Sequence, residues 1–300
     1  MPSRHVVRRS AEADYRPLSI PATGMRRWPV VDESVPGAVH TGFGVSELDP
    51  GGSVTSHVHS HEESVYVLSG SVALDTAGGS VLLREGDYGL VPAGVAHAWR
   101  NVGDQTARWA DMLAPQPRQR HNDDTFVVPD LPTGDPVEVD PRDPRTRRYG
   151  HITPQHMDPG KQNQELLAVS ASMRTALLVY SGITVKMMVD NELGARLSTM
   201  FMVQYEPDGV AGPHDHPLEE TYLILEGATD ATFDGERYRL EVGDIAWAGV
   251  GCVHSFTNAG NGPVRWLETQ APQPPSRHSY RFARDWEYLH DRLPDQGSKP

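Results

Sequence analysis

The 300-residue sequence contains one cysteine, Cys252, and therefore cannot form an internal disulfide. This shortage is typical of a reducing compartment and predicts a cytoplasmic protein. No run of 18 apolar residues occurs, so no segment is long enough to span a bilayer as a helix. The basic stretch at the N-terminus has no apolar segment after it, which argues against a secretory signal.

Basic residues are also in short supply, with 27 Lys and Arg against 40 Asp and Glu and a net charge of −13. A chain this acidic is repelled by phosphate backbones and by anionic lipid, so we expect no nucleic-acid partner and no membrane partner. Apolar stripes with a helical period are scarce, whereas 28 Gly and 25 Pro provide many turns. The composition therefore predicts an all-β chain of short strands.

The chain repeats itself. SHVHSHEESVYVLSG at 56–70 is matched by PHDHPLEETYLILEG at 213–227, so that His57 and His214 stand 157 positions apart (214 − 57). The same offset joins the APQP at 114–117 to the APQP at 271–274. A constant offset over so many positions indicates two copies of one domain.

The repeat predicts a division of the chain into five parts, and the linking segment is rich in Pro, Asp and Arg without apolar periodicity. Each copy holds short segments broken by Gly, Pro and Asp, which predicts a β-sandwich or small barrel. The parts are an N-terminal arm at 1–23, a first barrel at 24–121, a connector and lead-in at 122–180, a second barrel at 181–278, and a tail at 279–300 with a short helix predicted at 283–293.

Alternating histidines open the first repeat. Residues two apart in a strand share a face, so His57, His59 and His61 can point inward together with Glu63. The second copy has Leu218 at the position of His61, and a ligand needed at both sites is therefore not expected there. Glu62 and Glu63 align with Glu219 and Glu220, so the repeat does not show which glutamate of each pair is the ligand. Only the alternation of faces along a strand favours the second of each pair as the ligand.

A further histidine follows a Gly-rich turn in each copy and completes a set of three imidazoles and one carboxylate. Such a set leaves a six-coordinate ion two open positions, which Fe(II) or Mn(II) would use best, although Ni, Co or Zn would also bind. We expect up to two divalent metal ions per chain. The predicted ligands are His57, His59, Glu63 and His97 in the first copy, and His214, His216, Glu220 and His254 in the second.

The spacing of these residues resembles the cupin superfamily. The first motif is complete in Gly51, His57, His59, Glu63 and Gly70, and the second in Gly86, Pro92, Gly94, His97 and Asn101. The second copy departs in two turn positions, Asp208 and Gly249, and keeps all its ligands. The resemblance implies a bicupin of two cupin_2-type domains, which are tandem duplicated jelly-roll β-barrels with an internal metal site each. Such barrels commonly form homo-oligomers.

Positions that differ between the copies are candidates for substrate contacts. By alternation from the ligands, Val65 and Trp99 should face the first metal, and Tyr222 and Phe256 the second. Trp109 is repeated as Trp266, so we interpret this pair as core. Apolar and aromatic walls favour an aromatic or mixed organic substrate over a phosphate.

The resemblance implies an enzyme, most plainly a dioxygenase that acts on a small enolic, phenolic or carboxylate substrate chelated to the metal, with O₂ as co-substrate. Glu63 or Glu220 would be the catalytic base. Cupins with this ligand set include quercetinase-like dioxygenases and oxalate-handling enzymes, whereas gentisate-type bicupins usually lack the glutamate. One alternative is a non-oxidative decarboxylase, isomerase or aminohydrolase. Another is a non-catalytic cupin that binds a small molecule.

Overall fold

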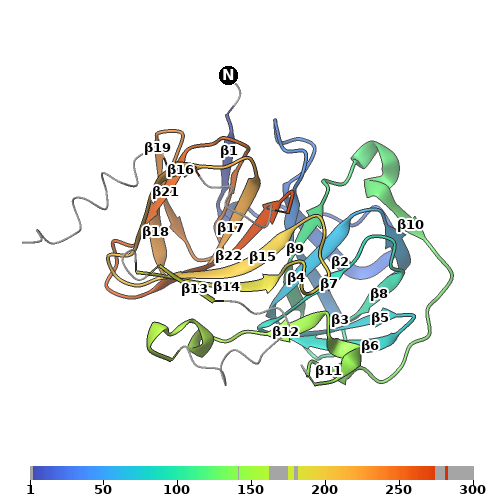
Figure 1. Ribbon diagram of the computed structural model, residues 1–300. Helices are drawn as coiled ribbons and strands as arrows, with labels where there is room; N and C mark the ends of the chain where they lie inside the picture. The colour runs from blue at the N-terminus through green and yellow to red at the C-terminus, as the bar shows by residue number, and fades with distance from the viewer. Residues whose placement is uncertain (1–2, 141, 162–174, 179–181, 274–280, 283–300) are drawn as a thin grey trace, which may run out of the picture.

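The computed structural model describes residues 3–140, 142–161, 175–178, 182–273 and 281–282. These residues form β-strands joined by turns and a few short 3₁₀ helices (Figure 1), which confirms the predicted all-β fold. The helix predicted at 283–293 lies outside the described residues. Among the helices that the structure describes, none has the length and apolarity needed to cross a membrane.

The first barrel is one sheet wrapped around the long strand β3 (Gly42–His59). Residues 42–48 of β3 pair with β9, and residues 53–57 pair with β8, so this strand passes from one wall of the barrel to the other. The other strands are β2 (Ala22–Val31), β4 (Glu62–Ser69), β5 (Ser71–Thr76), β6 (Gly79–Arg84), β7 (Asp87–Val91), β8 (His97–Arg100), β9 (Ala107–Ala114), β10 (Thr125–Val127), β11 (Val137–Glu138) and β12 (Tyr149–His151).

The second barrel repeats this plan with two separate sheets, in the orders β1-β20-β17-β22-β15-β14-β13 and β19-β18-β21-β16-β23. The two barrels lie side by side in Figure 1, as expected for a tandem jelly roll. The strands of the second barrel are β1 (His5–Arg8), β13 (Thr175–Leu178), β14 (Ile183–Val189), β15 (Thr199–Tyr205), β16 (Val210–Asp215), β17 (Glu219–Glu226), β18 (Ala228–Phe233), β19 (Glu236–Glu241), β20 (Ile245–Ala248), β21 (His254–Thr257), β22 (Val264–Ala271) and β23 (Arg281–Phe282).

The arm adds β1 to the second barrel, and the connector adds β10, β11 and β12 to the first. β1 of the N-terminal arm pairs antiparallel with β20, and so extends a sheet of the second barrel. β12 of the connector pairs antiparallel with β7, the matching strand of the first barrel. The connector also contains the 3₁₀ helices η3 (Pro144–Thr146), η4 (Pro154–Met157) and η5 (Pro159–Lys161), while η1 (Ser10–Glu12) follows β1 and η2 (Gln119–Asp124) follows β9.

Three groups of buried apolar residues form the core. One fills the first barrel around Trp99 and Trp109, and another fills the second around Phe256 and Trp266. The third joins the outer faces of both barrels, and includes Trp28, Leu90, Met112, Met202 and Trp247. Because both barrels contribute to this third group, they bury apolar surface against each other.

Two buried glutamates also cross between the barrels. Glu62 at the start of β4 accepts hydrogen bonds from the backbone N–H groups of Arg196 (2.8 Å) and Leu197 (2.9 Å). Its counterpart Glu219 accepts from the backbone of 39–41 at 2.8, 3.0 and 3.0 Å. Each barrel therefore anchors a loop of the other through a charge-assisted set of hydrogen bonds.

Candidate metal centres and active site

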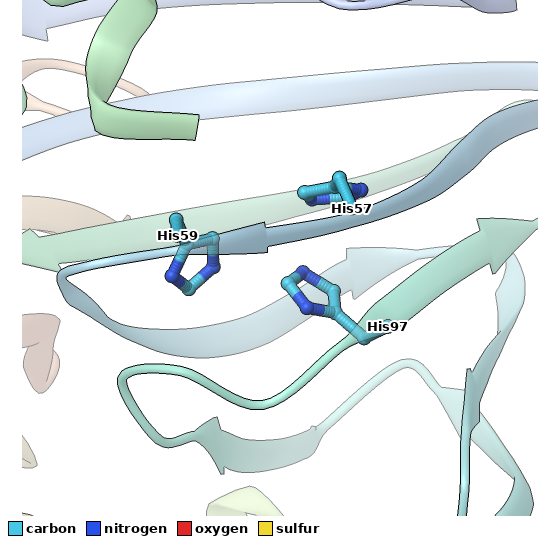
Figure 2. A group of neighbouring side chains, drawn as sticks. All are labelled: His57, His59 and His97. Carbon is cyan, nitrogen blue, oxygen red and sulfur yellow. The ribbon is translucent and has the colours of Figure 1, made fainter. Parts of the chain in front are cut away.

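Strand pairing brings the three histidines of the first barrel together. His57 and His59 end β3, His97 begins β8, and the register places His57 directly opposite His97. Figure 2 shows the three imidazoles turned toward a common centre. The ring centroid of His97 lies 4.1 Å from that of His57 and 4.8 Å from that of His59. One nitrogen of each ring lies within 4.8 Å of the others, which is close enough to share one metal ion.

The tautomer of each ring is set by the backbone. The Nδ1 atoms of His57, His59 and His97 lie 2.8, 2.7 and 3.0 Å from the carbonyl oxygens of Thr55, His61 and Val95. A carbonyl can only accept, so Nδ1 carries the proton and Nε2 keeps its lone pair for the centre. Alternation along the strand predicts that these side chains point into the barrel, and the hydrogen bonds to backbone carbonyls orient their rings.

Glu63 at the start of β4 reaches the same centre. Its Oε2 atom lies 3.4 Å from Nε2 of His59 and 3.4 Å from Nε2 of His97. Burial by itself would raise the pKa of the Glu63 carboxyl, but hydrogen bonds and charge attraction from His59 and His97 in their protonated forms outweigh that effect, and the pKa is well below its usual range. The carboxylate is therefore ionised, as a metal ligand must be.

These residues fit a divalent metal ion. Burial lowers the pKa of His57 to about 4, with the neighbouring His97 adding to the effect, so the ring is neutral at physiological pH. Nε2 of His97 is buried and has no hydrogen-bond partner among the described residues. A buried nitrogen with a lone pair, next to an ionised carboxylate and two further imidazoles, is a donor set that a metal satisfies.

The second barrel repeats this arrangement. His214 in β16 lies opposite His254 in β21, and one nitrogen from each of His214, His216 and His254 falls within the same 4.8 Å limit. Oε2 of Glu220 lies 2.7 Å from Nε2 of His216 and 3.3 Å from Nε2 of His254. Burial lowers the pKa of His214 to about 4. The Nδ1 atoms again lie near backbone carbonyls, those of Gly212, Leu218 and Cys252.

The two centres differ in how the carboxylate is held. Tyr222 donates a hydrogen bond to Oε2 of Glu220, and Gln270 donates one to Oε1. The matching positions of the first barrel carry Val65 and Leu113, which cannot donate. The rings of Tyr222 and Phe256 pack 4.7 Å apart between centroids, with Phe256 6.0 Å from His254. Aromatic rings and hydrogen bonds to Glu220 thus occupy the space beside the second centre.

A cavity of about 440 Å³ opens beside the first centre and reaches His57, His59 and Glu63. Its polar wall includes a buried ion pair between Arg27 and Asp111. The ring of Trp99 lies edge-on to that of His97, with 6.2 Å between centroids, and stacks on the ring of Trp109, with 5.2 Å between centroids. The apolar wall includes Leu18, Ile20, Met25, Val54, Trp99, Trp109 and Leu113.

The structure places the predicted pocket residues unevenly. Trp99 lines the first cavity, whereas Val65 is buried in the core and does not reach that cavity. Tyr222 and Phe256 lie beside the second centre. Trp109, interpreted from sequence as core, is buried and also lines the cavity.

His61 and Cys252 lie close to the two centres without joining the ligand groups. His61 is buried and stacks on His59 with 3.9 Å between centroids, so it supports a ligand ring. Burial raises the pKa of the Cys252 thiol to about 12, which makes it a poor nucleophile.

Residues from the arm and from β2 were missed by the sequence analysis, although they line the first cavity. They include Leu18, Ile20, Met25 and Arg27. These segments carry no motif and no repeat, and their place depends on how β2 pairs with β3. The one available signal was Asp111, an acid in a mostly apolar strand, which the second copy matches with Glu268.

The Cupin domain family matches residues 44–113 and 201–269, the central part of each barrel. Protein SchB of Streptomyces halstedii is 35% identical over 102 residues, which cover 33% of this chain and 74% of that protein. The chain belongs to the cupin superfamily. It is a bicupin, because both copies match.

A second curated relative of the bicupin is named polyketide synthase CurC, from Streptomyces cyaneus. It is 35% identical over 91 residues, which cover 29% of the bicupin and 59% of CurC. The bicupin therefore aligns with somewhat less than two thirds of the length of that relative. Each of these alignments spans about the length of one barrel.

Solved structures support the two-barrel fold of the bicupin over nearly its whole length. Lactobacillus farciminis oxalate decarboxylase superposes with a TM-score of 0.62 at 16% identity, covering 96% of the bicupin and 93% of that chain. A variant of salicylate 1,2-dioxygenase from Pseudoaminobacter salicylatoxidans gives 0.63 at 17% identity, covering 88% and 79%. At these identities the likeness establishes the fold alone.

Proposed function

We propose that this bicupin is a metal-dependent oxygenase that acts on a small enolic or phenolic compound of polyketide type. The carrying observation is the first centre, where three imidazoles and an ionised carboxylate border a cavity of about 440 Å³. The polyketide class is suggested by the relative named polyketide synthase CurC. Fe(II) or Mn(II) is the proposed metal, held by His57, His59, Glu63 and His97.

The first barrel is the better candidate for catalysis. Its cavity gives a substrate access to the centre, and among the described residues only histidines form hydrogen bonds or ion pairs with the carboxylate of Glu63. In the second barrel, Tyr222 and Gln270 hold both oxygens of Glu220. We therefore propose a catalytic first centre and a second centre whose metal stabilises the fold.

The residues around the first centre support this chemistry in distinct ways. A bound divalent ion would supply Lewis-acid and one-electron chemistry. Glu63 borders the cavity and is placed to accept the proton that an enol or phenol loses on binding. Trp99, Ile20 and Leu18 form an apolar wall that would orient a flat ring and keep water out.

Metal analysis followed by O₂ uptake tests this proposal. Protein purified without chelators or a nickel column should contain about two equivalents of Fe or Mn, and should consume O₂ with enolic or phenolic polyketide-type compounds. Less than about 0.2 equivalents, even after anaerobic reconstitution, would contradict the metal centres. A Glu63→Gln variant that retains full activity would contradict the role of the carboxylate.

A non-oxidative reaction is the second candidate, because Glu63 could move a proton in an isomerisation or decarboxylation without any O₂. The observation that favours it is the position of the Glu63 carboxylate, 3.4 Å from two ligand nitrogens and bordering the cavity. Product formation that continues unchanged under strict anaerobiosis would select this candidate. Stoichiometric O₂ consumption would select the oxygenase.

A further inference from the structure

A partly buried arginine, Arg27, stands in the wall of the first cavity. Arg27 in β2 donates from Nε (2.8 Å) and Nη2 (2.5 Å) to the same oxygen, Oδ1 of Asp111 in β9. Oδ2 of Asp111 accepts from the Ser46 hydroxyl at 2.7 Å. The Arg27 and Asp111 side chains are 17% and 2% exposed, so this ion pair is held away from bulk water.

The pair leaves part of the guanidinium available. Within the described residues, the guanidinium of Arg27 donates hydrogen bonds to Asp111 alone, and Nη1 has no acceptor. Arg27 lines the same cavity as His57, His59 and Glu63, and is close enough to Glu63 for their charges to interact. The free edge of a planar guanidinium is a strong binding group for carboxylates and other anionic oxygens.

Neighbouring backbone is adapted to this arginine. A Cβ atom on Gly44 in β3 would lie 2.8 Å from both Cζ and Nη2 of Arg27, and 2.5 Å from the backbone oxygen of Trp28. Any side chain at this position would therefore push the guanidinium out of its place. The glycine lets β2 approach β3 closely while the arginine lies across the strand.

The second barrel shows that the fold does not need this arginine. By strand pairing, Val185 stands opposite Val203 as Arg27 stands opposite Ser46. Phe201 takes the place of Gly44, and Glu268 the place of Asp111. The same barrel is thus built with an apolar residue and no buried cation at this position. A buried ion pair is weak evidence for stability, because desolvation offsets much of its attraction.

We propose that Arg27 binds a carboxylate of the substrate and so selects organic acids whose enol or phenol oxygen meets the metal centre. The inference rests on the proposed function of the first barrel. The free edge of Arg27 would hold the carboxylate, while Asp111 and Ser46 fix the plane of the guanidinium. Leu18, Ile20 and Trp99 would contact the ring between the two polar ends.

Binding of a matched pair of probes tests this selection. The probes are 3-hydroxy-2-naphthoate and its amide, which share the ring and phenol and differ in the charge of one group. Calorimetric titration of the full-length protein, loaded with Mn(II) under anaerobic conditions, should show the acid binding at least 10-fold more tightly than the amide. Arg27→Met should abolish this preference by lowering the affinity for the acid while leaving the affinity for the amide unchanged.

Arg26→Met is the matched control, because Arg26 is the neighbouring residue of β2, outside the cavity, and pairs with Glu47 and Asp49. It should keep the preference of the wild type. If Arg27→Met misfolds because Asp111 is left unpaired, the double variant Arg27→Met/Asp111→Asn removes both charges and should also lose the preference. Arg27→Lys keeps the positive charge but lacks the planar pair of N–H donors of a guanidinium, so it should retain only part of the preference for the acid.

The outcomes separate this inference from the proposed function. Failure of the wild type to bind Mn(II) refutes the metal centre itself. Normal Mn(II) content together with equal affinity for acid and amide, or no binding of either probe, refutes the role of Arg27 and leaves the metal centre standing. Retention of the acid preference in folded Arg27→Met refutes that role as well.

Discussion

Glu62 and Glu63 are neighbours in the chain, yet their carboxylates serve opposite sides of β4. Glu63 lies 3.4 Å from two ligand nitrogens inside the barrel, whereas Glu62 accepts hydrogen bonds from the backbone of the other barrel. Alternation along a strand separates them. Replacing each glutamate by glutamine can therefore separate an effect on the metal centre from an effect on the contact between the barrels.

We expect Glu63→Gln to lower kcat by about 10²- to 10⁴-fold with the first-barrel metal retained, because three imidazoles remain while the proton acceptor is lost. Glu62→Gln should leave metal content and kcat unchanged and lower the free energy of unfolding by about 1–3 kcal/mol, because it weakens buried hydrogen bonds. Metal analysis, steady-state kinetics and urea denaturation check the pair. Similar kinetics in both variants would rule out Glu63 as the base.

The ligand histidines allow the two centres to be tested separately. His57→Ala and His214→Ala should each reduce metal content from about two equivalents to about one, because each leaves one site with only two of its three imidazoles. Only His57→Ala should abolish turnover if the first centre is catalytic. Turnover lost in His214→Ala and kept in His57→Ala would transfer the proposed activity to the second barrel.

At the scale of elements, β3 does most to assemble the site. Its first part pairs with β2 and β9, which carry Arg27 and Asp111, and its last part carries His57 and His59. A single 18-residue strand thus joins the ion pair of the cavity wall to the metal centre. The antiparallel pairing of β2 with β3 holds Arg27 beside Asp111.

Gly44→Ala tests that packing. The added Cβ would meet the Trp28 backbone and the Arg27 guanidinium at 2.8 Å or less, so we expect a loss of about 1–3 kcal/mol in unfolding free energy. Gly78→Ala is the control, because its Cβ would have no atom nearer than 3.6 Å. Urea denaturation of both variants is the measurement. Equal stability of the two would show that β2 and β3 can separate without cost.

For the whole molecule, the barrels are joined through shared apolar core and exchanged contacts. β1 of the N-terminal arm pairs with the second barrel, and the carboxylates of Glu62 and Glu219 each anchor a loop of the opposite barrel. The chain should therefore unfold as one cooperative unit despite its internal duplication.

Glu219→Gln tests the coupling between barrels. Its carboxylate is fully buried and accepts three backbone hydrogen bonds from the first barrel, so we expect a loss of about 1–3 kcal/mol. Calorimetry should still show a single transition, shifted to lower temperature. The exposed Glu241→Gln is the control and should leave the transition in place. Two separate transitions in Glu219→Gln would mean that the barrels unfold independently.

Sequence alone determined the fold and predicted which histidines lie together, because both depend on local repeats and on spacing. The 157-residue offset between His57 and His214 identified two copies, and the alternation of residues in a strand selected Glu63 over Glu62. Leu218 removed His61 from the predicted ligand set, and in the structure His61 stacks on His59 and lies outside the group of three histidines.

Tertiary structure decided what surrounds the two centres. Arg27, Gly44 and Asp111 lie on three strands, so their proximity follows from pairing between distant segments that no local pattern predicts. The same holds for Gln270 of β22, which donates a hydrogen bond to Glu220 of β17, whereas Tyr222 lies on the same strand as Glu220. A ligand motif is short enough to be recorded in spacing, whereas a cavity depends on which side chains the folded strands bring together.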